Sequence, residues 1–497
     1  MVYSFNLGIG WASSGVEYAQ AYRARAFRAL GVPARFVFTD MFPQEDIEHL
    51  TRNIGFADDE VVWLYSHFSD FRTAPVSYTL AQFEATLADQ GFRVTRDGRR
   101  GRLTFSGSKD YCSLYFVDEG HDLLHRVEYV SRGLLVRKDY FTYGRTYSEY
   151  YAPLDGRAHL YLRRFFNEDG SVALEEMPDG ATTVFRLKDR VLYSKEDLVG
   201  ELVRSLGLTE KDVVLVDRTT GIGQAILENA GAARVGVVVH ADHYSASGTD
   251  DEHVLWNNYY EYPFDMHRHV DFYVTSTEAQ ARLLERQFER YVGEAPRVVA
   301  IPVGSLDALS RPESPRRPFS VVTASRLASE KHVDWVIRAC ALAHERVPGL
   351  TLDVCGAGAE AGRLEALVGE LGAEGYVRLL GQCEMSEVYP RHELYLSGST
   401  SEGFGLSLME AVGSGLALIG FDVPYGNPTF VDDGANGHLV PLAEGMQEDD
   451  RVRALAGEVV RYFLEDDKAA FEERSYEVAS AYLTDRVAAR WGEVIGA

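Results

Sequence analysis

Two glutamates, Glu402 and Glu410, are separated by seven residues in the glycine-rich segment SEGFGLSLMEA. The glycines permit close approach of a backbone, and the free N–H groups of a helix that begins there suit a diphosphate. Eight residues of helix span about 12 Å, roughly the separation of hexose and ribose in a nucleotide sugar. One carboxylate can then bind sugar hydroxyls and the other ribose hydroxyls. The alternative is an amphipathic helix with an exposed glutamate and a cap.

Two cations, Arg326 and Lys331, follow directly on a predicted strand, 319–324, in the segment ASRLASEK. Positive charges at that edge of a sheet can neutralise the charge that builds on a departing diphosphate. An arginine and a lysine five residues apart are by themselves usually solvated surface. Their place after a strand, together with the Glu402 loop, favours the functional interpretation.

The acidic residues show no spacing that is typical of a metal site. No Asp-x-Asp pair follows a predicted strand, and the cluster 448–450 is typical of a solvated loop. Since divalent cations such as Mg²⁺ need convergent oxygen ligands, we expect no catalytic metal. No cofactor is expected either.

The elements that must position these residues follow a strand–helix–strand rhythm at both ends of the chain. Apolar spacing predicts a strand at 2–7, a small-residue loop at 8–15, a helix at 16–30 and strands at 34–39 and 61–65. A strand–helix–strand order predicts a parallel sheet with right-handed crossovers. The same rhythm returns after Tyr193.

Between 75 and 193 the sequence pattern changes to short runs of aromatic and β-branched residues, separated by turn sequences such as RDGRRGR, NEDG and PDG. Such a pattern predicts an inserted antiparallel β meander. The basic run 96–102 is interpreted as one of its hairpin turns, solvated, with contact to an acceptor or a partner as the less favoured role.

The proline-rich, charged segment 310–318 predicts a linker, after which a second α/β cycle runs from 319 to 421. Two doubly wound Rossmann-like halves place a ligand cleft at the carboxyl ends of their strands. The expected fold is therefore α/β with two such domains and the β insertion. The expected boundaries are 1–74 with 194–310 for the N-terminal domain, 75–193 for the insertion, 311–481 for the C-terminal domain and 482–497 for a last helix that packs back on the N-terminal domain.

The chain is strongly acidic, with a net charge of −25 from 75 acidic and 50 basic residues. A surface of this sign repels polyanions and disfavours a nucleic-acid partner. We find no run of about 18 apolar residues and no signal peptide, so we expect no transmembrane segment. The four cysteines lie far apart and are expected to be buried thiols.

The order SRLASEK followed by SEGFGLSLMEAVGSGLALIGFDVP resembles the donor half of family 4 retaining GT-B glycosyltransferases. The resemblance implies a UDP-sugar donor, retention of the α configuration and catalysis without a metal. It also implies that Glu402 meets the donor sugar and Glu410 the ribose. The UDP-sugar-binding set that it implies is Gly15, Arg326, Lys331, Glu402, Gly403, Phe404, Gly405, Leu406 and Glu410.

A narrower resemblance covers nearly the whole chain. The segments NLGIGWASSGVEYAQAYRARAFR, VDRTTGIGQA and VVVHADHY, with the β insertion and the donor loop, are similar to GtfA-type protein O-GlcNAc transferases. The family primes serine-rich-repeat adhesins, so the resemblance implies transfer of GlcNAc from UDP-GlcNAc to serine or threonine hydroxyls. It further implies a hetero-oligomer with a degenerate, GtfB-like GT-B subunit, in the cytoplasm or peripherally at the inner face of the membrane.

The same resemblance assigns roles in the N-terminal half. Gly15 matches a glycine loop near the donor phosphate, and His240 matches an active-site histidine near the donor sugar. His243 could take the place of His240, or it could line the acceptor side with Thr220 and Gly221. The catalytic set is then His240, Arg326, Lys331 and Glu402.

Three functions remain open at this point. The first is the protein O-GlcNAc transferase, with the choice between GlcNAc, glucose and galactose not encoded in any motif. The second is a wall teichoic acid glycosyltransferase, which the net charge disfavours. The third is a non-catalytic adhesin-binding subunit, which should have lost Arg326, Lys331, Glu402 and Glu410, all present here.

Overall fold

The computed structural model describes residues 1–9, 15–42, 46–180, 182–443 and 445–497. They form two compact units, the first from residues 1–21, 33–238 and 256–271 and the second from 22–32, 239–255 and 272–497. Three sheets carry the fold, two of them parallel and one antiparallel. The predicted α/β class with an antiparallel β insertion is confirmed.

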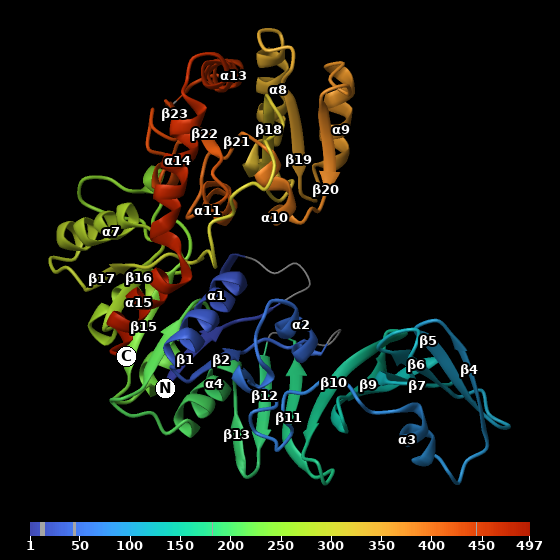
Figure 1. Cartoon of the computed structure of the whole chain (residues 1–497). Helices are drawn as coiled ribbons and strands as arrows, with labels where there is room; N and C mark the ends of the chain where they lie inside the picture. The colour runs from blue at the N-terminus through green and yellow to red at the C-terminus, as the bar shows by residue number, and fades with distance from the viewer. Residues whose placement is uncertain (10–14, 43–45, 181, 444) are drawn as a thin grey trace. The chain divides into compact units, whose positions relative to one another are not determined.

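A seven-stranded sheet has the order β17-β16-β15-β14-β1-β2-β3 (Figure 1). The registers of β1 with β2 and β14, of β2 with β3, of β14 with β15 and of β16 with β17 are parallel. Its strands are β1 Val2–Asn6, β2 Ala34–Phe38, β3 Val61–Trp63, β14 Val213–Val216, β15 Arg234–Val239, β16 Phe272–Thr275 and β17 Val298–Ala300. Helices α1 (Gly15–Leu30), α4 (Lys195–Ser205), α5 (Gly223–Asn229) and α7 (Glu278–Tyr291) connect them.

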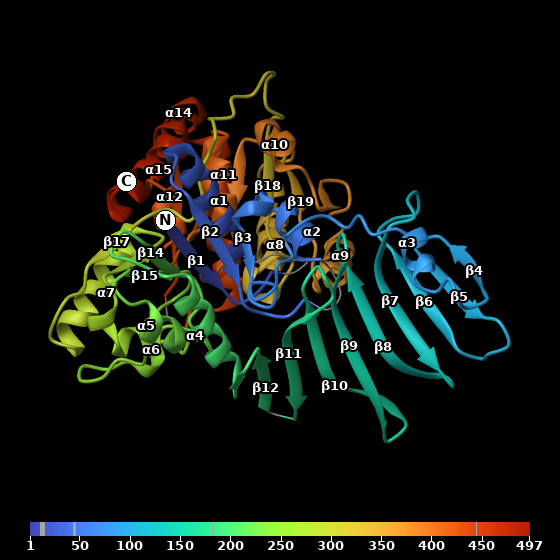
Figure 2. The ribbon, with the colours of Figure 1, turned by 90° about the horizontal axis from the view of Figure 1, so that it is seen from below.

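The antiparallel sheet contains ten strands in simple meander order, β4 to β13 (Figures 1 and 2). Helix α3 (Leu80–Ala85) lies against its β4–β8 end, where Phe83 joins a buried apolar cluster. The strands are β4 Phe92–Asp97, β5 Arg100–Phe105, β6 Tyr111–Phe116, β7 Leu124–Ser131, β8 Leu134–Phe141, β9 Arg145–Leu154, β10 Arg157–Phe166, β11 Val172–Asp179, β12 Thr182–Leu187 and β13 Arg190–Leu192.

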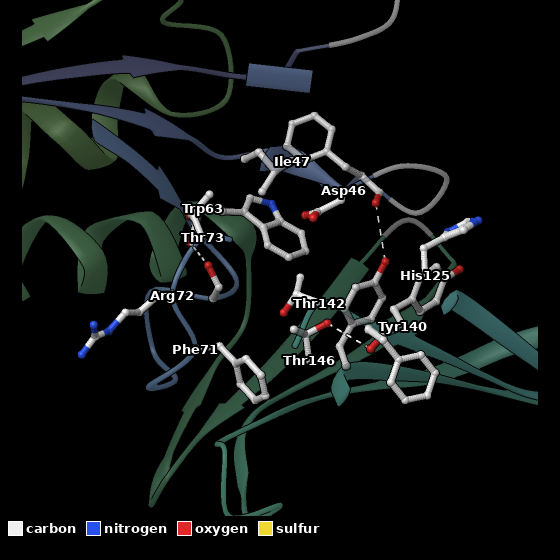
Figure 3. Close-up of a pocket in the computed structure, with 14 residues that line it drawn as sticks. Asp46, Ile47, Trp63, Phe71, Arg72, Thr73, His125, Tyr140, Thr142 and Thr146 are labelled. Atoms are coloured by element: carbon white, nitrogen blue, oxygen red, sulfur yellow. Dashed lines mark hydrogen bonds between the residues drawn. The ribbon is translucent and has the colours of Figure 1, made fainter. Parts of the chain in front are cut away.

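A series of aromatic rings joins strand β3 to strands β8–β10 within the first unit. Tyr65 stacks on Phe165 with 5.2 Å between ring centroids, Phe165 on Tyr147 at 5.3 Å, and Tyr147 on Tyr140 at 4.2 Å. Trp63 lies edge-on to Phe165 and Tyr147. Trp63, Tyr140 and Tyr147 line a pocket that Figure 3 shows, with Trp63 on one side and Tyr140 on the other. The stacked rings therefore hold strands β8–β10 of the ten-stranded sheet against the end of β3.

We expect Phe165→Ala to lower the free energy of unfolding by about 3–5 kcal/mol, because a buried ring lost from a packed core leaves a cavity. Phe165 is 2% exposed and contacts three other aromatic rings. Thermal denaturation followed by circular dichroism measures the effect, and Tyr193→Ala, at a side chain that is 73% exposed, is the control. Equal melting temperatures for the two variants would contradict this assignment.

The third sheet has six strands in the order β20-β19-β18-β21-β22-β23, paired in parallel. Successive side chains of a strand point to opposite faces, and here Val321 and Val322 belong to two different core clusters. Both faces are therefore buried, as in a doubly wound domain. The strands are β18 Ser320–Ala324, β19 Thr351–Cys355, β20 Val377–Gly381, β21 Leu394–Leu396, β22 Ala417–Asp422 and β23 Gly437–Pro441.

Helices α8 (Val333–His344) and α13 (Glu448–Leu464) contribute to one core cluster, and α11 (Leu406–Gly413) and α14 (Lys468–Ala479) to the other, with Phe471 of α14 in the first. Helix α9 (Ala361–Glu370) follows β19. The last helix, α15 (Thr484–Ile495), packs on α1, where the Trp491 ring lies edge-on to Phe27 and under the Arg23 guanidinium.

Candidate functional site

The structure brings Glu402 and Lys331 together. Lys331 Nζ donates to Glu402 Oε2 at 2.6 Å, and the two side chains are only 18% and 20% exposed. Glu402 lies in the loop between β21 and α11, and Gly405 begins the helix with φ 90°. That left-handed backbone favours glycine, and the helix N-terminus behind the pair is suited to an anion.

A second glycine, Gly398, explains how Lys331 comes so close to this loop. Lys331 ends a 3₁₀ turn (Ser329–Lys331), and His332 has φ 43° before α8 begins. A Cβ atom added at position 398 would lie 2.5 Å from the His332 carbonyl oxygen. Only glycine therefore lets the two segments pass without a shift of backbone.

The other predicted cation, Arg326, lies on the surface beyond strand β18. It forms an ion pair with Glu330 at 3.0 Å, and its side chain is 74% exposed. Because the pair is solvated, it holds the guanidinium weakly, and the side chain is able to turn toward an anion.

Glu410 lies on helix α11 and is half-buried. Burial, and to a lesser extent the charge of Glu384, raise the pKa of this carboxyl to about 7. Glu410 therefore titrates near neutral pH. Phe404, named with it in the binding set, is 5% exposed and packs on Phe430, so its ring anchors the loop from below.

The segment after β15 reaches the same loop. The His240 carbonyl oxygen would lie 3.3 Å from a Cβ atom at Gly403, and Ser401 Oγ donates to Asp242 Oδ2 at 3.3 Å. Leu406 follows at the first position of α11. The structure thus gathers His240, Gly403 and Glu402 with Lys331.

His243, by contrast, is fully buried and turned toward helix α7. A ring nitrogen lies 2.7 Å from Gln287 Oε1, and Gln280 Nε2 donates to the Ala241 carbonyl at 2.8 Å. Burial lowers the pKa of the imidazole to about 4, so it is neutral at physiological pH. This geometry favours a supporting role over the acceptor-side role expected from the sequence.

Gly15, Thr220 and Gly221 belong to the first unit. Gly15 is exposed at the start of α1, and a Cβ atom there would meet nothing within 4 Å. The expected loop 8–15 falls largely on 10–14, which lie outside the described residues. Gly221 has φ 72° in an exposed turn before α5, where glycine is favoured.

Sequence reasoning missed Tyr425 and Gly426. Gly426 N donates to the Glu402 carbonyl at 2.7 Å, and Tyr425 forms a parallel bridge with Glu402. Tyr425 has φ 108°, which is rare for a residue with a side chain and marks a constrained backbone. The aromatic–glycine pair in VPYGNP was the available signal.

Among the described residues, no group of three or more histidine, cysteine, aspartate or glutamate side chains is arranged to hold a metal ion. Nor is any helix in the described part of the chain long and apolar enough to cross a membrane.

Two family models match the chain. One, described as the GtfA extended beta-sheet domain, matches residues 93–189, and the other, glycosyl transferases group 1, matches residues 309–456. The first range falls on the ten-stranded sheet and the second on the six-stranded sheet with the Glu402 loop.

Similar proteins match over the full length. The UDP-N-acetylglucosamine–peptide N-acetylglucosaminyltransferase GtfA subunit of Streptococcus gordonii is 49% identical over 99% of this chain and 98% of its own. The crystal structure of pneumococcal O-GlcNAc transferase GtfA in complex with UDP and GlcNAc has a TM-score of 0.92 at 45% identity, covering 100% of this chain and 98% of that one. A GtfA/B complex gives a TM-score of 0.96 at 48% identity, with 100% and 99% covered. With this identity along its whole length and with the GT-B fold, the chain belongs to the family of GtfA subunits of UDP-N-acetylglucosamine–peptide N-acetylglucosaminyltransferases.

Proposed function

We propose that this chain is a retaining glycosyltransferase that moves GlcNAc from UDP-GlcNAc to serine or threonine hydroxyls of a serine-rich-repeat adhesin, the first step of its O-glycosylation. The observation that carries the proposal is the Lys331–Glu402 pair before the N-terminus of α11, with Glu410 half-buried on that helix. The S. gordonii relative is named for this donor and a peptide acceptor.

In the proposed reaction, donor binding exchanges the partners of the charged pair. Lys331 leaves Glu402 for the diphosphate, Arg326 joins it, and Glu402 accepts hydrogen bonds from the sugar. Backbone N–H groups around Gly403 and Gly405 face the phosphates, as helix N-termini do for anions. Gly15 completes the phosphate contacts, and His240 lies near the sugar.

The chemistry proposed is front-face substitution. The bond between the anomeric carbon and the diphosphate oxygen breaks, and the acceptor hydroxyl oxygen bonds the same carbon on the same face. The departing diphosphate oxygen takes the hydroxyl proton, so no metal or protein nucleophile is required. Lys331 and Arg326 stabilise the charge that develops on the leaving group. Trapping of a covalent glycosyl-enzyme would overturn this mechanism.

We further propose that the chain works with a GtfB-like GT-B subunit, which supports acceptor binding, and that it acts in the cytoplasm or peripherally at the inner face of the membrane. The similarity to the GtfA/B complex supports the partner.

The test incubates the purified chain, with and without such a partner, with UDP-GlcNAc, UDP-glucose or UDP-galactose and a serine-rich polypeptide. Intact-mass spectrometry reports the mass added. Addition of one or more N-acetylhexosamines supports the proposal. Hydrolysis of the donor with no transfer to polypeptide would retain the donor assignment and refute the acceptor.

Glu410 gives this reaction a pH dependence. The carboxylate accepts hydrogen bonds from ribose hydroxyls better than the protonated form does, and its pKa in the free protein is about 7. We therefore expect kcat/KM for the donor to rise about ten-fold from pH 6 to pH 8 and to level off above. Initial rates at low donor concentration measure it. The profile of Glu410→Gln should be flat across this range, and an unchanged inflection in that variant would assign the titration to another group.

A further inference from the structure

The loop that carries Glu402 lacks regular structure, so contacts with other segments must set its position. Besides the packing of Phe404, three polar contacts among the described residues do so: the Lys331 ion pair, the backbone bond from Gly426 to Glu402, and the hydrogen bond from Ser401 to Asp242. The first of them is lost if the donor diphosphate takes Lys331, as the proposed function requires. The other two polar contacts then help to hold Glu402 against the sugar.

Asp242 is suited to this task, because helix α7 holds the residues on either side of it. Gln280 binds the Ala241 carbonyl, and Gln287 holds the buried His243 ring. The His243 ring in turn lies 6.4 Å from the Tyr425 ring. Helix α7 therefore holds one side of the Ser401–Asp242 bond nearly fixed.

The hydrogen bond from Ser401 favours the charged form of Asp242. Burial raises the pKa of its carboxyl, and the hydroxyl of Ser401 opposes that rise by donating to the charged form. Tyr425 lies near enough for the charge of Asp242 to contribute, after burial, to the raised pKa of the Tyr425 phenol. Asp242 thus accepts the bond from Ser401 and lies near Tyr425, whose neighbour Gly426 donates to the Glu402 carbonyl.

We propose that Asp242 is a positioning residue of the transferase: by accepting the hydrogen bond of Ser401 it fixes the Glu402 loop for the donor sugar once Lys331 has turned to the diphosphate. This inference rests on the proposed function of the site. It assigns to Asp242 no contact with substrate, and its effect passes through Ser401.

A double-mutant cycle tests it. Asp242→Ala and Ser401→Ala should each lower kcat/KM for UDP-GlcNAc about ten-fold, the size of a hydrogen bond to a charged group. The double variant should lose no more than either single one, because both remove the same bond. Asp242→Asn keeps an acceptor oxygen and should stay within about three-fold of the unchanged protein.

Asp251→Ala is the matched control, since this carboxylate belongs to the same segment but is 98% exposed and pairs with Arg290. It should leave the rate unchanged. Melting temperatures check that the variants are folded, and Ser401→Ala removes only a hydroxyl if Asp242→Ala should prove unstable.

The positioning role would be overturned if the fold-loss in kcat/KM of the double variant equalled the product of the two single losses. A loss for Asp242→Ala much larger than that for Ser401→Ala would also overturn it. Rates equal to the unchanged protein would do so as well. Failure of the proposed function is distinguishable, because it appears as absence of transfer in the unchanged protein. In that case the rate of UDP-GlcNAc hydrolysis is measured for the same variants.

Discussion

Glu402→Gln is expected to give a folded protein whose kcat for sugar transfer is about 100- to 1,000-fold lower, the usual cost of one lost group that acts on transition-state charge. The amide preserves the shape of the side chain, and the backbone bond from Gly426 to Glu402 does not depend on the carboxylate. What is lost is a negative charge beside a sugar that becomes positive as its bond to the diphosphate breaks.

Single-turnover mass spectrometry with saturating UDP-GlcNAc measures this loss, and calorimetry with UDP alone measures nucleotide binding. Because UDP lacks the sugar, its affinity should change little. Glu387→Gln, at a surface glutamate that is 71% exposed, is the matched control and should keep full activity. A Glu402→Gln variant within about five-fold of the unchanged protein would remove Glu402 from the reaction.

The sequence predicted the parallel strands and the donor loop because both depend on local patterns. Buried parallel strands appear as apolar runs, and the strand expected at 319–324 is β18, Ser320–Ala324. A glycine that must begin a helix with positive φ is visible at Gly405. The pairing of Lys331 with Glu402 was also within reach, since both follow neighbouring strands of one parallel sheet.

The supporting contacts were not predictable, since they join segments far apart in the chain. Asp242 meets Ser401 across 159 positions, and His243 meets Gln287 across 44. No periodicity records such pairs. His243 illustrates the consequence. A histidine just after a strand suggested a role in the reaction, while its burial against α7 supports a structural role.

The basic run 96–102 shows the same difference between a local pattern and its tertiary use. The expected hairpin is confirmed, with β4 and β5 on either side of the turn at Gly98. Arg96, however, is not merely solvated: it donates to Asp122 and to the carbonyls of Asp118 and His121, and its guanidinium lies 3.9 Å from the Phe116 ring centroid. It therefore fixes the turn between β6 and β7.

Lys331→Met should have the largest effect of all, lowering kcat by about 1,000-fold, because Lys331 is already bonded to the loop before α11, at 2.6 Å from Glu402, and without it the departing diphosphate keeps most of its charge. Lys331→Arg, which preserves the charge, should recover a large part of the rate. Since Glu402 and Lys331 act on opposite charges of one transition state, the double variant with Glu402→Gln should be little slower than Lys331→Met alone. Rapid-quench kinetics on the unchanged protein, Lys331→Met, Glu402→Gln and the double variant provides the comparison. Fully multiplied losses would mean that the two residues act at separate steps, and the 2.6 Å pair would then be only a resting contact of the donor-free protein.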